Sequence, residues 1–96
     1  PITALHREVM EETGWRIRVR RHLCTFRRFT FMPEYDLWAE KICAIYLARP
    51  VLQLGPPTEV GHVPIWMPLT DAAGFLGNVG DQAVLRQALS GAFGPV

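Results

Sequence analysis

The chain has 96 residues, of which 49% are hydrophobic and 20% are charged, and this composition is typical of a globular protein rather than a disordered one. The formal net charge of +1 excludes a global electrostatic attraction to nucleic acid. The longest apolar run, Ile42–Ala48, is far shorter than the roughly 20 residues needed to span a membrane.

An amphipathic helix is expected over about residues 1–13. At 100° per residue, Glu8, Glu11 and Glu12 fall on one side of this helix. The opposite side carries the apolar residues Ile2, Leu5, Val9 and Met10. Pro1 suits the first helical position, and Gly14 suits the left-handed residue that ends a helix.

Glu8, Glu11 and Glu12 lie in the C-terminal half of the helix, where negative charge destabilises it. Like charges at i, i+4 cost about 0.2–0.5 kcal/mol, and each carboxylate in the last turn costs about 0.3–1 kcal/mol. Arg7 offsets part of this cost. A divalent cation would reverse it, because Mg2+ prefers oxygen ligands. Geometry alone slightly favours a solvated acidic face over a metal site.

A strand is expected after Gly14, because apolar and basic residues alternate from Arg16 to Leu23. Phe26, Phe29 and Phe31 extend it, with a break near Arg27–Arg28. Residues 32–36 form a loop by composition. The second strand covers Trp38–Arg49 and ends at Pro50. Apolar residues on both of its faces predict a central, doubly covered strand.

The remaining elements are shorter. Residues 55–59 predict a loop, and His62–Met67 predict a short strand that Pro64 makes an edge or bulged one. Thr70 or Asp71 can cap a helix that continues to Leu76. A last helix is expected over Asp81–Leu89, ended by Gly91.

Residues 7–15 read R-E-V-M-E-E-T-G-W. This run resembles the second half of the Nudix box, G-x5-E-x7-R-E-U-x-E-E-x-G-U, where U is a bulky apolar residue. All five fixed positions of that half match, and Val9 and Trp15 suit the two apolar positions. The first glycine and glutamate of the box are absent, and the spacing places that glutamate two residues before Pro1.

The resemblance implies an α/β fold, a Nudix-like α/β/α sandwich with a mixed sheet. Residues 1–96 are then a single Nudix domain that is incomplete at its N-terminus, without the first strands and the first half of the box. The helix–strands–helix order and the stretch Trp66-Met67-Pro68-Leu69 fit this interpretation. Family members are often dimers, so a homodimer is a candidate assembly.

The implied activity is that of a metal-dependent pyrophosphohydrolase, which cleaves the diphosphate linkage of a nucleoside diphosphate joined to another moiety. The metal ligands are then Glu8, Glu11 and Glu12, binding Mg2+ or Mn2+. Glu8 is a ligand or the general base, and Arg7 orients a glutamate through a salt bridge. Cations held by carboxylates neutralise charge on phosphate oxygens and orient the attacking water.

A further catalytic acid is expected from the loop before Trp66, and Glu59 is the first candidate. A role as an exposed loop acid is the alternative for Glu59. The rival acids are Glu34, Asp36 and Glu40. His62 could contact substrate, but a surface histidine is the simpler interpretation. Tyr35 and Trp38 could stack on a base, whereas Trp66 is interpreted as structural.

Two alternatives to the hydrolase remain. One is a catalytically inactive Nudix-like module that binds nucleotides, and the other is isomerase chemistry on isoprenyl diphosphates, for which these residues offer no support beyond the fold. The substrate stays open among nucleoside triphosphates, dinucleoside polyphosphates, nucleotide sugars, ADP-ribose and NADH. Partners are expected to be small molecules rather than nucleic acid or membrane. Two isolated cysteines, Cys24 and Cys43, predict free thiols and a cytoplasmic location.

Overall fold

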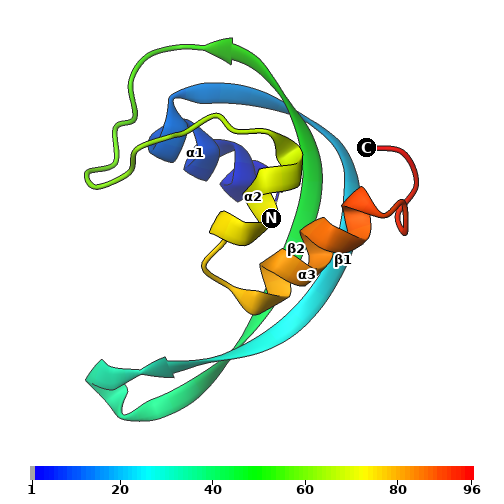
Figure 1. The fold of residues 1–96 in the computed structure, drawn as a ribbon. Helices are drawn as coiled ribbons and strands as arrows, with labels where there is room; N and C mark the ends of the chain where they lie inside the picture. Colours follow the sequence, from blue (N-terminus) through cyan, green and yellow to red (C-terminus); the bar gives the residue numbers. More distant parts are fainter. Residues whose placement is uncertain (1) are drawn as a thin grey trace. The chain divides into compact units, whose positions relative to one another are not determined.

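The computed structural model describes residues 2–96, which form a mixed α/β structure with three α-helices and a two-stranded antiparallel sheet (Figure 1). The helices and strands are α1 (Ile2–Thr13), β1 (Trp15–Met32), β2 (Leu37–Gln53), α2 (Leu69–Phe75) and α3 (Val79–Leu89). A 3-10 turn, η1 (Pro33–Tyr35), joins the two strands. The expected mixed α/β class is therefore confirmed.

The chain divides into two compact units, and both strands contribute to each. Unit 1 contains the described residues up to Arg21 together with Ala48–Met67. Unit 2 contains His22–Leu47 and Pro68–Val96. Unit 1 therefore holds α1, one end of the β1–β2 hairpin and the loop that follows β2.

Helix α1 has the expected extent and ends as its sequence predicts. The predicted role of Pro1 lies outside the described residues. Gly14 adopts a φ of 79°, and its amide donates to the Met10 carbonyl at 2.8 Å. The Thr13 hydroxyl donates to the Val9 carbonyl at 2.6 Å. The left-handed glycine thus turns the chain directly from the helix into β1.

The loop after β2 is attached to the end of α1 through main-chain atoms. The Thr58 and Glu59 amides both donate to the Glu11 carbonyl at 2.9 Å, and the Leu54 amide donates to the Gly14 carbonyl at 2.9 Å. The last carbonyls of a helix have no partner within it, so this loop supplies the missing donors. The approach is close, because a Cβ at Gly14 would lie 1.9 Å from the Gly55 carbonyl oxygen.

The two strands are longer and less interrupted than expected. The predicted break at Arg27–Arg28 is wrong: β1 is continuous, and its burial alternation instead shifts by one residue at Leu23 and Cys24, which are both half-buried. Strand β2 continues past Pro50 to Gln53. Within residues 2–96 the sheet has two strands, so both are edge strands, and an edge strand tolerates a proline whose position needs no donor.

The prediction that β2 is a central strand covered on both faces is also wrong. Ile42 is 70% exposed, so its apolar character reflects an uncovered face rather than a second layer. In unit 2 the large apolar side chains of this face are exposed, namely Phe29, Phe31, Trp38 and Ile42. The other face of the hairpin lies toward α3, where a Cβ at Gly80 would come within 2.5 Å of the Phe26 ring.

The segment His62–Met67 is irregular, so the predicted short strand is wrong. Pro64 and the following Pro68 have no amide hydrogen, and a strand that lacks these donors cannot complete a ladder. Helix α2 begins after Pro68 without a side-chain cap. Asp71 therefore lies within the first turn, and the predicted Thr70 or Asp71 cap is also wrong.

Helix α3 begins two residues earlier than predicted. Asn78 caps it, because the side-chain oxygen of Asn78 accepts a hydrogen bond from the Asp81 amide at 3.1 Å. Its end is as expected, since Gly91 has a φ of 88° and donates to the Ala88 carbonyl.

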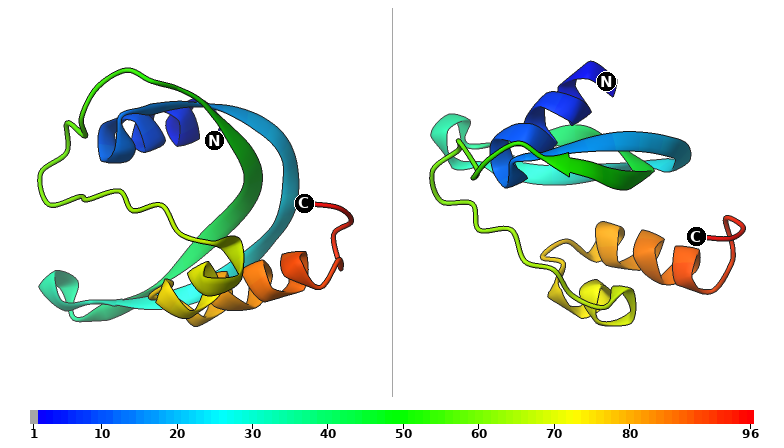
Figure 2. Two further views of the ribbon diagram at one scale, coloured as in Figure 1. Left: turned by 45° about the horizontal axis from the view of Figure 1, so that its top comes forward. Right: turned by 90° about the horizontal axis from the view of Figure 1, so that it is seen from above.

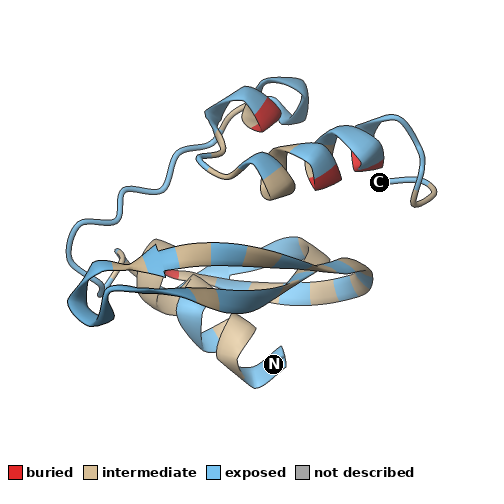
Figure 3. Cartoon of the chain, turned by 90° about the horizontal axis from the view of Figure 1, so that it is seen from below, coloured by how far each residue is buried: buried red, intermediate tan, exposed pale blue. Residues whose placement is uncertain are grey.

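The buried apolar side chains of the described residues all lie in unit 2. They are Ala73 on α2 and Val84 and Ala88 on α3 (Figure 3). The two helices lie side by side in the views of Figure 2. Small residues at this contact allow the helices to approach closely. None of the helices within residues 2–96 is long and apolar enough to cross a membrane.

Replacing Gly14 by alanine should destabilise the fold more than the same change at Gly61. Both glycines have positive φ values, of 79° and 91°, but a Cβ at Gly61 meets nothing within 4 Å. We expect Gly61→Ala to cost about 1–2 kcal/mol, the strain of a left-handed residue. Gly14→Ala should cost clearly more, because the loop must also move away from the helix. Urea unfolding followed by circular dichroism measures both, and equal losses would contradict the close approach.

Candidate functional site

The acids of α1 separate into two groups in the structure. Arg7 forms salt bridges with Glu8, at 3.8 Å from Nη2 to Oε1, and with Glu11, at 4.0 Å from Nε to Oε1. The side chains of all three residues are well exposed, so these contacts contribute little to stability. The expected contact between Arg7 and a glutamate of the motif is therefore present. Glu12 has its ion-pair partner in the loop.

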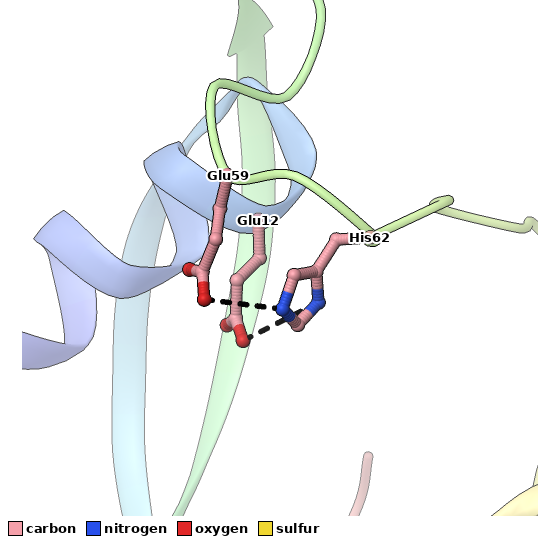
Figure 4. Close-up of side chains that lie close together, drawn as sticks. All are labelled: Glu12, Glu59 and His62. Carbon is pink, nitrogen blue, oxygen red and sulfur yellow. Dashed lines mark ion pairs between the residues drawn. The ribbon is translucent and has the colours of Figure 1, made fainter.

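Glu12 instead meets Glu59 and His62 from the loop (Figure 4). The His62 Nδ1 atom lies 3.6 Å from Glu12 Oε1, and its Nε2 atom lies 3.2 Å from Glu59 Oε1. One ligand atom from each residue lies within 4.8 Å of the others. We call Glu12, Glu59 and His62 the carboxylate–histidine cluster.

Main-chain geometry brings these three side chains together. Glu12 occupies the last turn of α1, and the two amides that bind the Glu11 carbonyl are those of Thr58 and Glu59. The position of Glu59 is therefore fixed relative to the residue that precedes Glu12. Gly61, with a φ of 91°, then turns the chain so that His62 follows. The cluster thus depends on how the loop satisfies the helix end.

The donor set of the cluster fits a divalent cation of intermediate hardness. Carboxylate oxygens suit Mg2+ and Mn2+, whereas an imidazole nitrogen is better suited to Mn2+ and later transition metals. The side chains are each exposed by about 40% to 47%, which leaves space for water molecules in a coordination shell.

The structure brings together only part of the predicted site. Glu12 and Glu59 lie in the same cluster, as the interpretation of Glu59 as the loop acid requires. Within residues 2–96, the cluster is the group of His, Cys, Asp and Glu side chains that converge closely enough to share an ion, and Glu8 and Glu11 lie outside it. His62 is an exposed histidine, as predicted, and it also contacts both cluster acids. Its i, i+3 spacing from Glu59 in a loop with glycine is the sequence signal for that contact.

The rival acids and the aromatic candidates all lie in unit 2. Glu40 forms a salt bridge with Arg27, at 3.2 Å from Oε1 to Nε. Trp38 packs edge-on against Phe31, with ring centroids 5.4 Å apart, and Tyr35 is 67% exposed. Arg28 Nε is buried and has no hydrogen-bond partner among the described residues. None of these contacts brings an acid toward a histidine.

Comparison of the chain with protein-family models, characterised proteins and solved structures finds no match. The Nudix resemblance therefore stays a prediction that rests on residues 7–15.

Removing either acid of the cluster should leave the fold nearly unchanged. Exposed ion pairs contribute about 0–1 kcal/mol, so Glu12→Gln and Glu59→Gln should each shift the free energy of unfolding by less than about 1 kcal/mol. Glu40→Gln is the matched control, because it removes one partner of the exposed Arg27 pair in unit 2. Urea unfolding curves test this expectation, and a loss of several kcal/mol would assign the cluster a structural role.

Proposed function

We propose that the chain is a metal-dependent hydrolase of the Nudix type, which cleaves the diphosphate linkage of a nucleoside diphosphate joined to another moiety. The observation that carries this proposal is the convergence of Glu12, from the acidic helix end, with Glu59, from the loop before Trp66. The motif predicts a role for Glu12, the position before Trp66 predicts one for Glu59, and the two carboxylates lie in one cluster. The further approach of His62 supports a cation-binding role for that place.

The finer fold assignment is part of the same proposal. Residues 1–96 would belong to a single Nudix domain with an α/β/α sandwich and a mixed sheet. Two features support it: helix α1 carries the motif and ends at Gly14, and a loop acid packs against that end. Neither feature depends on side-chain packing in unit 2.

The cluster residues would hold the cation, with Glu12 and Glu59 as oxygen ligands and His62 as a nitrogen ligand. A bound Mg2+ or Mn2+ supplies Lewis acidity that neutralises charge on the phosphate oxygens. Hydrolysis also needs a group that accepts a proton as the water oxygen bonds to phosphorus and the bridging P–O bond breaks. Glu8 and Glu11 are exposed carboxylates, and Arg7 restrains their orientation through two salt bridges. One of them can accept that proton.

Hydrolysis should depend on the cluster acids and on divalent metal. We expect Mg2+- or Mn2+-dependent release of phosphate or nucleotide from at least one nucleoside diphosphate derivative in a broad panel. Glu12→Gln and Glu59→Gln should lower kcat by about 100-fold or more, because each removes a charged oxygen ligand of the cation, and loss of even an outer-shell partner of a ligand costs roughly 10- to 100-fold. Glu34→Gln should leave kcat unchanged, because Glu34 lies in η1 outside the cluster.

Each result has a distinct meaning. Full activity in both cluster variants would remove Glu12 and Glu59 from the mechanism and overturn the proposal. Binding of metal and nucleotide without turnover in the parent chain would replace the hydrolase with the nucleotide-binding module. Activity that falls equally in Glu34→Gln would show that the loss reflects surface charge rather than the cluster.

A further inference from the structure

Unit 1 contains an open pocket of about 230 Å3 beside the helix end. Its walls include Val9 and Thr13 from α1, Trp15 from β1, Pro50 from β2, and Pro64 and Trp66 from the loop. The Trp15 and Trp66 rings meet edge to face, with centroids 5.5 Å apart and planes 86° apart. Trp66 is 70% exposed, so much of its surface can contact a ligand.

The pocket offers few side-chain groups that could read a hydrogen-bonding pattern. The Thr13 hydroxyl is already used, because it donates to the Val9 carbonyl and accepts from the Trp15 amide. Pro50 and Pro64 have no amide hydrogen. The two indole N–H groups donate but cannot accept. A ligand group here is therefore recognised by shape and apolar contact, and a sugar would lose hydrogen bonds to water without replacing them.

The pocket and the carboxylate–histidine cluster are built by the same two segments. On α1, Glu12 directly precedes Thr13, which lines the pocket, and at 100° per residue it lies between the pocket side and the side of Glu8 and Glu11. In the loop, His62 lies two residues before Pro64. A ligand with an anionic end and a planar apolar end could therefore use both at once.

We propose that this pocket binds the base of a nucleotide by contact with Trp15 and Trp66, without selecting among the four bases. The inference rests on the proposed function for the phosphate end of the ligand. A cavity of about 150 Å3 is sufficient for a benzene-sized ring, so the pocket can hold one single or fused ring. Because the pocket is open, the polar edge of the base stays in water. Base–aromatic contact of this kind tolerates every base.

The test is a titration of the full chain with ADP, GDP, CDP and UDP in Mg2+, followed by tryptophan fluorescence. We expect each nucleotide to quench the signal, with dissociation constants within about 10-fold of one another, since stacking strength alone separates the bases. Inorganic pyrophosphate should cause no comparable quench. Trp66→Leu should weaken nucleotide binding by about 5- to 150-fold, the range for loss of one stacking contact.

The chain provides a matched control in Trp38. This residue is 68% exposed, packs against Phe31 and belongs to unit 2. Trp38→Leu should therefore leave the dissociation constants unchanged. Trp66→Phe, which keeps an aromatic ring, should retain most of the affinity, and circular dichroism of each variant excludes unfolding as the cause of a loss.

Three results would overturn the inference: unchanged affinity in a folded Trp66→Leu variant, equal losses in the Trp38→Leu control, or a preference above 100-fold for a single base. The same titrations separate this inference from the proposed hydrolase. Quenching by the nucleotides but not by pyrophosphate, without turnover, would support the base pocket and contradict the hydrolase. Metal-dependent turnover that Trp66→Leu does not affect would support the hydrolase and contradict the base pocket.

Discussion

The carbonyl of Glu11, in the last turn of α1, is the acceptor on which the arrangement of unit 1 depends. Two consecutive loop amides bind it, and a third loop amide binds the carbonyl of Gly14. The end of a helix always leaves such carbonyls without partners. Here they determine where the loop lies, and the loop in turn brings Glu59 and His62 to Glu12. The same main-chain hydrogen bonds therefore position both the cluster and the loop residues that line the pocket of Trp15 and Trp66.

The electrostatics of the same helix end are consistent with a cation-binding role. The partial negative charge of the helix C-terminus adds to the charges of Glu11 and Glu12, and the loop contributes Glu59. Arg7 compensates on the side of Glu8, whereas His62 is the group that faces Glu12 and Glu59. Because every partner is partly exposed, water screens these charges and the fold tolerates them. The same exposure leaves the carboxylate oxygens accessible from solvent.

The helix of unit 1 could be predicted from sequence, because its signals are local, whereas the strand predicted over His62–Met67 in the same unit is wrong. The acid spacing and Gly14 predict the extent and end of α1, whereas the role of Glu59 as the loop acid stays a prediction. The errors arise where tertiary context decides. The apolar pattern of β2 is the same for a strand covered on both faces and for one with an exposed face, and Ile42 belongs to the latter. The contact of His62 with Glu12 and Glu59 depends on a loop docking that uses main-chain atoms, which leave no side-chain signature.

That docking also determines which kinds of sequence change this loop can accommodate. Its three hydrogen bonds join main-chain atoms at Leu54, Thr58 and Glu59 to those of Gly14 and Glu11, so the side chains of Pro56 and Thr58 take no part in them. Most replacements at such positions preserve the attachment. A deletion between Leu54 and Thr58 would shorten the span between the anchoring amides, and one end would then lose its acceptor, whereas an insertion can extend into solvent. The constraint on this segment is therefore on its minimum length and on the presence of an amide hydrogen at the three anchoring positions.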